Sequence, residues 1–477
     1  ADPAARAGGK GNLTLIGSQA SAGGDVALQA TGDVLLANAT DTYSVQKSSS
    51  KKGTFSSSAK ASAKFETTTV GSQVSGENVR ISAGDNVLIT GSGVTARNDL
   101  GVKAENGDVI VAAAQDTYYG YSKESKSKFN FGEILMSPVN IVTGKDTIVY
   151  TKTEEMNKNT QATNVGSVLS AGNNLKLDAG RDVSVIGSLV EAGNDLGLYA
   201  GRDVNLIPGR ENFTSEHQKK KTELGLWSSL GESGFSAFAG TKSQETGLKS
   251  TGNYSAGSLV SAGNDVIIEA GRNVNQVGSH IQAGQDVYLE AGQDWNMTAS
   301  YDHETMHQYV KTVEAGIGAS ISQNVSGAVR DVANAPGNVM DAKGGAGYTA
   351  LTAAGEGMRV VGSVKGAVYE PVSVSANIGA SSSKSDYKAS SSTAQPSTVL
   401  AGRDVIASAG RDITLAGGRA QAVEDAVLEA GRDLTIIAAK HSSESKRSSS
   451  SSSASIGGKI AFGPSPTGLY ESGASLG

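Results

Sequence analysis

One string in this chain combines residue types and a spacing that could perform metal chemistry. His303-Glu304-Thr305-Met306-His307 matches the pattern His-Glu-x-x-His. On a helix this spacing puts two histidines on one face to bind zinc, and the glutamate activates a water molecule. The surrounding residues are instead those of a polar strand, and no third ligand follows at a recognised spacing. We interpret His303, Glu304 and His307 as strand residues, because residues four apart also share a face of a strand. A zinc protease is the alternative, which measuring bound zinc would decide.

Aspartate and asparagine recur at fixed intervals and could bind calcium. They occupy the fourth position of a five-residue phrase, Ala-Gly-Arg-Asp-Val, which stands complete at 179–183 and 200–204. Calcium-binding β-roll repeats need Gly-Gly-x-Gly-x-Asp about every nine residues. This chain has one Asp or Asn per turn, often beside an arginine, so pairing of Arg with Asp between coils is the simpler interpretation. We assign these residues to structural turns and expect no cofactor. The positions are Asp25, Asp33, Asn78, Asn86, Asp99, Asp108, Asn174, Asp182, Asp195, Asp203, Asp265, Asn273, Asp286, Asp294, Asp404, Asp412, Asp425 and Asp433.

The spacing of these positions predicts the elements that carry them. Within a pair the interval is 8 residues, or 9 for Asp99 and Asp108, and successive coils of a block are 21 residues apart. Alternating apolar residues follow each position, which predicts short strands with one buried face. Gly-x-Asp/Asn and Gly-Ser supply the turns between them. Three strands and three turns per 21 residues predict an all-β fold, a parallel β-helix solenoid in which Val183 lies over Val204 and Asp182 over Asp203.

The repeat stops after every pair of coils. The interruptions begin with polar strands, continue through Lys/Ser-rich middles and end in small and apolar residues, which predicts long β-hairpins whose charged edges keep unpaired strands soluble. The interruption 299–396 also has helical residues at 329–334 and 348–354, which predict a short helical insert that caps the rod or, alternatively, acts on membranes. The expected coils are 9–36, 71–111, 166–207, 257–298 and 397–437, and the expected excursions are 37–70, 112–165, 208–256, 299–396 and 438–477.

Composition excludes several classes of function. A net charge of −6 over 477 residues argues against nucleic acid or an anionic membrane as an electrostatic partner. The chain has no cysteine and no run of about 20 apolar residues. A polysaccharide lyase, another β-helix enzyme, would need acidic and basic residues grouped where the repeat breaks, but the arginines here lie within the repeat. We therefore expect no enzyme and no small-molecule substrate. The opening Ala1-Asp2-Pro3 looks like a cloning or processing scar, so we expect a fragment.

The Ala-Gly-Arg-Asp-Val and Ala-Gly-Asn-Asp-Leu phrases, the paired coils and the Lys/Ser-rich interruptions resemble one family from Asn12 onward. This is the filamentous haemagglutinin family, in its second haemagglutinin repeat region, and most of all the contact-dependent growth inhibition exoproteins of the CdiA type. The resemblance implies a large filament on the bacterial surface or secreted outside the cell, exported by an outer-membrane transporter of two-partner secretion through a domain that this chain lacks.

The resemblance also implies a role for the excursions. We expect a rod segment that helps deliver a carboxy-terminal toxin across the outer membrane of a target cell, with the membrane or a surface receptor as partner. The alternative is an adhesin or haemagglutinin region that binds host or bacterial surface glycans or receptors. A toxin domain with a downstream immunity gene, or further repeats, in the natural gene would distinguish the two.

Overall fold

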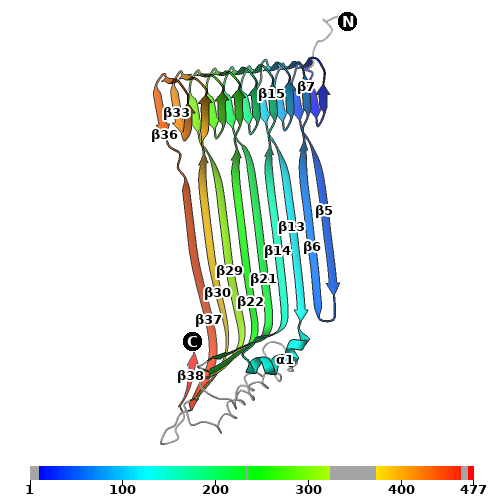
Figure 1. Ribbon diagram of the computed structural model, residues 1–477, viewed down its shortest axis with the longest axis vertical. Helices are drawn as coiled ribbons and strands as arrows, with labels where there is room; N and C mark the ends of the chain where they lie inside the picture. The colour runs from blue at the N-terminus through cyan, green and yellow to red at the C-terminus, as the bar shows by residue number, and fades with distance from the viewer. Residues whose placement is uncertain (1–9, 232–233, 323–371, 463–470, 477) are drawn as a thin grey trace.

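The computed structural model describes residues 10–231, 234–322, 372–462 and 471–476, most of which lie in β-strands (Figure 1). These described residues form three parallel sheets that make up a rod, and a fourth, antiparallel sheet that extends from it. The predicted all-β solenoid is therefore confirmed. In Figure 1 the rod lies across the top and the strands of the fourth sheet run away from it, transverse to its axis.

The rod is a stack of three-stranded coils, and each of its sheets collects one strand from every coil. The first sheet contains β1 (Leu13–Ile16), β4 (Val34–Ala37), β9 (Val87–Thr90), β12 (Val109–Ala112), β17 (Val183–Ile186), β20 (Val204–Ile207), β25 (Val274–Val277), β28 (Trp295–Thr298), β33 (Asp412–Ala416) and β36 (Asp433–Ile437). The second contains β2 (Gln19–Ser21), β7 (Gln73–Gly76), β10 (Gly93–Ala96), β15 (Val168–Ala171), β18 (Leu189–Ala192), β23 (Leu259–Ala262), β26 (His280–Ala283), β31 (Ser397–Ala401) and β34 (Gly418–Gln421). The third contains β3 (Val26–Ala30), β8 (Val79–Ala83), β11 (Leu100–Ala104), β16 (Leu175–Ala179), β19 (Leu196–Ala200), β24 (Val266–Ala270), β27 (Val287–Ala291), β32 (Val405–Ala409) and β35 (Ala426–Ala430).

The core of the rod is the ladder of aliphatic side chains that the alternation predicts. Val183 pairs with Val204 and Val204 with Val274, and all three side chains are fully buried. Trp295 takes the next place in this row and is also fully buried, between Val274 and Ile413. Every coil thus adds a layer of apolar side chains to one continuous core, which is the main source of stability in a solenoid.

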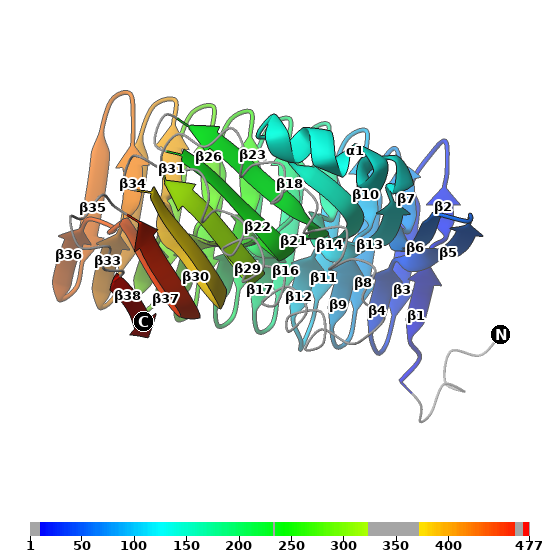
Figure 2. The same ribbon diagram turned by 90° about the horizontal axis from the view of Figure 1, so that it is seen from below.

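The fourth sheet, called here the hairpin sheet, consists of the excursions. Each leaves the rod after a strand of the first sheet, and the four excursions before β37 return to a strand of the second, so every hairpin departs from the same corner (Figures 1 and 2). Its strands are β5 (Ala39–Lys52), β6 (Ser56–Val70), β13 (Ala114–Phe129), β14 (Thr147–Val165), β21 (Gly209–Gly231), β22 (Gly234–Ala256), β29 (Ser300–Ser322), β30 (Val372–Gln395), β37 (Ser442–Phe462) and β38 (Glu471–Leu476).

The hairpins are present as predicted, but the expectation that their strands stay unpaired is wrong. Each hairpin also pairs with its neighbour: β6 with β13, β14 with β21, β22 with β29, and β30 with β37. The physical reason is a match of spacings. A hairpin occurs at every second coil and contributes two strands, so coils and hairpin strands both repeat about every 4.8 Å along the rod. Adjacent hairpins therefore meet at hydrogen-bonding distance.

The described part of the chain has one α-helix, and it lies where none was expected. Helix α1 (Phe131–Val142) connects β13 to β14, within the excursion 112–165, and packs against β14 and β21 at the far end of the hairpin sheet. The helices predicted at 329–334 and 348–354 lie outside the described residues. Within the described ranges, no helix is both long and apolar enough to span a membrane.

Candidate functional site

The eighteen predicted turn residues lie at two corners of the rod, in two ladders that run from coil to coil. In each step the side-chain oxygen of one coil accepts a hydrogen bond from the backbone N–H of the equivalent residue in the next. The Asp203 N–H donates to Asp182 Oδ1 at 3.1 Å, and the Asn273 N–H donates to Asp203 Oδ1 at 3.1 Å. One ladder joins Asp25, Asn78, Asp99, Asn174, Asp195, Asp265, Asp286, Asp404 and Asp425. The other joins Asn12, Asp33, Asn86, Asp108, Asp182, Asp203, Asn273, Asp294 and Asp412, with Asp433 in the same register.

Arginines pair with these carboxylates between coils, as the sequence suggested. Arg403 donates through Nε to Asp286 Oδ1 at 2.8 Å, and a second nitrogen contacts Oδ2. Asp286 is only 1% exposed, and the guanidinium of Arg403 holds the pKa of this carboxyl below its ordinary value. The Tyr288 hydroxyl and the Asp404 N–H also donate to it, at 2.9 and 3.1 Å. Such carboxylates serve the stacking of coils, and the described residues contain no group of three or more His, Asp or Glu arranged to hold a metal ion.

The His-Glu-x-x-His string lies on strand β29, where its geometry does not suit zinc. His303 and His307 share a face but stand four strand residues apart, roughly 13 Å, whereas one zinc ion needs both within about 2 Å. Glu304 points to the opposite face and accepts a hydrogen bond from the Tyr254 hydroxyl at 2.5 Å. His307 Nε2 lies 3.0 Å from Asp386 Oδ1. The motif residues therefore belong to cross-strand contacts of the hairpin sheet.

The part of the hairpin sheet farthest from the rod has two chemically different faces. We call residues 224–231, 234–241, 315–322 and 372–383 the distal band; these segments contain no Asp, Glu, Lys or Arg. Cross-strand pairs on one face, the aliphatic face, join Leu230 to Phe235, Phe235 to Ile321 and Ile321 to Val374. The same face continues through the paired Ile317, Ile378 and Ile456. The row of Phe235, Ile321 and Val374 is buried, whereas Leu230, Ile378 and Ile456 are exposed.

The opposite face of the distal band, the polar face, carries mainly serine and glycine. Ser236 pairs with Ser320, and Ser320 with Ser375. Its large side chains in the band are Trp227 and Phe238, which lie on neighbouring strands. The sequence signal for both faces is the alternation of apolar with small residues in several excursions, together with the loss of charge. Sequence reasoning noted the alternation but missed that these segments align into one band.

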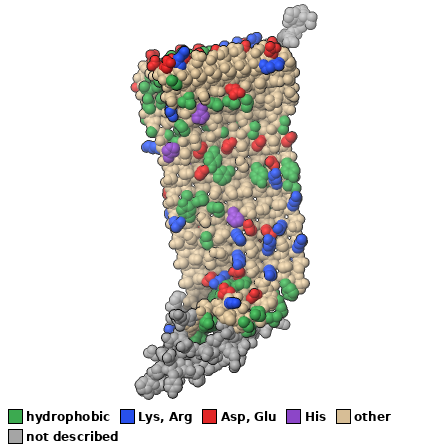
Figure 3. Space-filling view, in the orientation of Figure 1, with side chains coloured by type: hydrophobic (Ala, Val, Ile, Leu, Met, Phe, Trp, Pro, Cys, Tyr) green, Lys and Arg blue, Asp and Glu red, His purple; other side chains and the backbone are tan. Residues whose placement is uncertain are grey.

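Apolar side chains are also exposed at the end of the sheet. Helix α1 presents Leu135, Met136 and Val139, each more than half exposed. Phe55, in the turn between β5 and β6, lies 6.0 Å from Phe131 of α1, ring centroid to ring centroid. Figure 3 shows charged and hydrophobic side chains interspersed along the viewed face of the sheet, with further hydrophobic ones at its lower end. The hairpin sheet is thus mostly polar along its length and apolar at its tip.

Comparison with known proteins identifies the type of repeat. The sequence profile described as hemagglutinin repeat matches residues 4–64, 53–144, 148–253, 238–351 and 378–476. A 16S rRNA endonuclease CdiA of Enterobacter cloacae subsp. cloacae is 27% identical over 401 residues, which cover 79% of this chain and 11% of the relative. A tRNA nuclease CdiA of Escherichia coli is 27% identical over 36% of this chain and 5% of the relative.

A third relative, a tRNA nuclease CdiA of Yersinia mollaretii, is 35% identical over 24% of this chain and 4% of its own length. The chain therefore spans only a small part, about a tenth or less, of the curated relatives that it matches. No solved structure matches it significantly. The likeness lies in the repeats, and the expected resemblance to CdiA-type exoproteins is confirmed.

Proposed function

The chain belongs to the hemagglutinin repeat family of secreted bacterial surface proteins, and from this premise we propose that it is a rod segment that helps deliver a carboxy-terminal toxin across the outer membrane of a target cell. The partners in this proposal are a two-partner-secretion transporter in the producing cell, and the outer membrane or a surface receptor of the target. Hemagglutinin repeats are structural, and we ascribe no enzymatic activity to this segment. The nuclease activities named above are those of the relatives, and we do not assign them to this chain.

The observation that carries the proposal is the distal band. Strands that insert into an outer membrane are about ten residues long and alternate apolar with small or polar side chains. The band has this alternation on adjacent strands, without a charged residue in segments such as 234–241 and 315–322. Charged side chains resume where the strands approach the rod, as at Lys242. A sheet built this way can present Leu230, Ile378 and Ile456, which are exposed on the aliphatic face, to lipid while the rod and the charged part of the sheet remain in water.

The apolar tip supports the same orientation. Helix α1 and the β5–β6 turn expose apolar side chains at the end of the sheet, farthest from the rod. An amphipathic helix at such a position can lie in the interface of a bilayer. We therefore propose that the hairpin sheet meets the target membrane tip first, and that the rod holds the hairpins side by side.

Matched substitutions on β37 test this function. Ile456 is 70% exposed on the aliphatic face, and Ser455 is its exposed neighbour on the opposite face. In the full-length secreted protein, Ile456→Asp adds a charge to the lipid-facing side and should reduce killing of target cells and binding to their outer-membrane vesicles. Ser455→Asp adds the same charge to the polar face and should leave both unchanged. Surface display on the producing cell is the control for secretion and folding.

The adhesin alternative makes the opposite prediction. If the excursions bind a receptor or glycan without entering lipid, Ile456→Asp and Ser455→Asp should both retain vesicle binding. Equal killing and equal vesicle binding by the two variants, with normal surface display, would refute the proposed role of the aliphatic face.

A further inference from the structure

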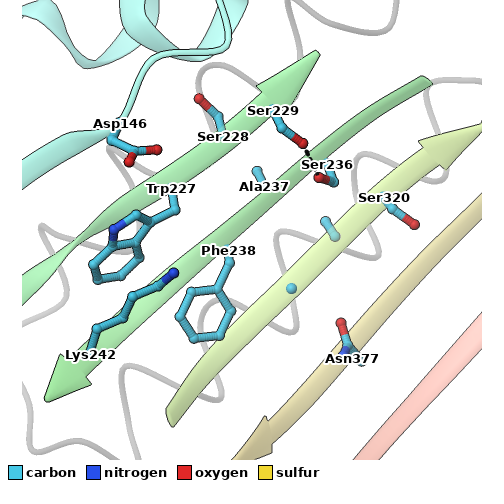
Figure 4. Close-up of a pocket in the computed structure, with 12 residues that line it drawn as sticks. Asp146, Trp227, Ser228, Ser229, Ser236, Ala237, Phe238, Lys242, Ser320 and Asn377 are labelled. Carbon is cyan, nitrogen blue, oxygen red and sulfur yellow. Dashed lines mark hydrogen bonds between the residues drawn. The ribbon is translucent and has the colours of Figure 1, made fainter. Parts of the chain in front are cut away.

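A cavity of about 430 Å³ lies on the polar face of the distal band. Strands β21, β22, β29 and β30 contribute to it, together with Asp146, which directly precedes β14 (Figure 4). We call it the Trp227 trough. Its volume falls within the range of roughly 300–1,000 Å³ typical of small-molecule sites. We infer that the Trp227 trough binds a saccharide, with a sugar ring against its aromatic side chains.

The aromatic wall of the trough consists of Trp227 and Phe238, whose ring centroids are 5.6 Å apart. Lys242 lies against these rings: its Nζ is 4.6 Å from the Trp227 ring centroid and 5.8 Å from that of Phe238. A cation over aromatic faces is attracted to them electrostatically. Lys242 Nζ also lies 3.3 Å from a carboxylate oxygen of Glu314. The wall is therefore an apolar surface whose one cation is balanced by a neighbouring anion.

Two glycines let side chains of the trough lie close against the sheet. Gly318 is the cross-strand partner of Phe238 and lines the trough. A Cβ at this position would come within 2.4 Å of Asn377 Oδ1 on the next strand. A Cβ at Gly316 would come within 2.9 Å of Phe238 Cζ. Because these positions carry no side chain, the Asn377 amide lies over Gly318 and the Phe238 ring over Gly316, and both side chains line the trough.

Hydrogen-bonding groups surround the aromatic wall. Ser229 and Ser236 lie at one rim, with their hydroxyl oxygens 2.7 Å apart. Ser320 and Asn377 lie across the trough from Trp227 (Figure 4). Within the described residues, the Asn377 amide and the Asp146 carboxylate make no hydrogen bond or ion pair to another side chain. These two groups are therefore free to bind a ligand.

This combination fits the chemistry of a saccharide. A pyranose ring has C–H faces, which pack against aromatic rings, and hydroxyl groups around its edge, which need donors and acceptors. The trough supplies an apolar wall with a polar rim, and the pairing of Lys242 with Glu314 removes the net positive charge that an anionic ligand would require. The inference goes beyond the proposed function, because it concerns the face opposite the aliphatic face and can hold whether or not the sheet enters lipid.

Tryptophan fluorescence tests the inference directly. The chain has two tryptophans, and Trp295 is fully buried in the rod, so a ligand in the trough should change the emission of Trp227. The probes are maltotriose, N,N′-diacetylchitobiose and delipidated core oligosaccharide of lipopolysaccharide, each titrated into the intact chain. We expect a saturable change with at least one of them, and its absence in Trp227→Phe, which removes the reporter.

Calorimetry with the same oligosaccharides separates the trough from the rest of the sheet. Phe238→Ala and Asn377→Ala should each weaken binding by about tenfold or more, the equivalent of about 1.4 kcal/mol. Phe213→Ala is the matched control, because Phe213 stacks on Tyr254 in the same sheet, at 5.8 Å, outside the distal band. It should bind as the parent does. Failure of all three probes to bind saturably, or equal weakening by Phe213→Ala, would overturn the inference; vesicle binding by the aliphatic face would be unaffected by either result.

Discussion

Removing the Asp286 carboxylate should loosen the rod where the longest excursion interrupts it. Asp286 precedes β27, and the coil stacked on it resumes only at Asp404, 118 residues later. The carboxylate accepts hydrogen bonds from Arg403 Nε, the Asp404 N–H and the Tyr288 hydroxyl, at 2.8, 3.1 and 2.9 Å. Asp286→Ala leaves the part-buried Asp404 amide, the Arg403 guanidinium and the Tyr288 hydroxyl without this acceptor, which should cost about 2–4 kcal/mol in local opening free energy.

Hydrogen exchange is the suitable assay, because coils of a solenoid open locally rather than in one cooperative step. A loss of 2–4 kcal/mol corresponds to amide exchange roughly 30- to 900-fold faster, here in peptides covering 280–291 and 397–409. Asp433→Ala is the control, since Asp433 is the corresponding turn residue in the last coil of the other ladder and its side chain is 68% exposed. It should change stability by less than about 0.5 kcal/mol. Unchanged exchange in Asp286→Ala, or an equal effect of Asp433→Ala, would refute the reasoning.

Three further outcomes are expected. Arg403 and Arg411 lower the pKa values of Asp286 and Asp294 in the folded rod. The stability that these carboxylates contribute is therefore fully present above the unfolded pKa of about 3.9 and is lost as the pH falls through the folded pKa values. Circular dichroism should show a less stable rod below about pH 4, and a rod stable to pH 2 would contradict this. Ser258→Ala should speed exchange around β20 and β23, because the buried Ser258 hydroxyl, with one hydrogen to donate, lies 2.7 Å from the carbonyl oxygen of Ile207 and 2.9 Å from that of Val185; parent-like exchange there would count against it. Replacing 208–256 by a Gly-Ser turn should expose the backbone amides of β14 and β29 to rapid exchange. Removing 37–70, at the edge of the sheet, should leave the amides of both strands protected. Equal protection of β14 and β29 in the two deletions would show that the hairpins do not depend on one another.

The rod could be predicted from the sequence because its signals are local and repeated. Each coil contains its own turn residues and its own alternation of apolar and polar residues. The stacking of Val183 on Val204 follows from the constant interval of 21 residues between coils. Where the pattern is weak in one coil, the other coils still predict its structure. The family resemblance rests on the same phrases, and the hemagglutinin repeat match confirms it.

The hairpin sheet could be predicted only in part, because it depends on contacts between excursions. A single excursion shows two strands and a turn, but the pairing of β6 with β13 or of β22 with β29 follows from the spacing of the coils that hold them. The band likewise emerges only when 234–241 is placed beside 315–322. Helix α1 was missed because its signals are weak: Asn130 at its start makes no side-chain cap, and Pro138 lies inside it.

The most direct test of the proposed function is a cysteine scan of β30 in contact with target membranes. The natural chain has no cysteine, so single substitutions can carry an environment-sensitive dye at alternating positions of one strand. On addition of outer-membrane vesicles from target cells, dyes on the aliphatic face should shift to the blue, and dyes on the polar face should not. The first set is Ala376→Cys, Ile378→Cys and Ala380→Cys, and the second is Ser375→Cys, Asn377→Cys and Ser381→Cys. A period of two along the strand is the predicted result; no shift at any position, or equal shifts in both sets, would contradict the account.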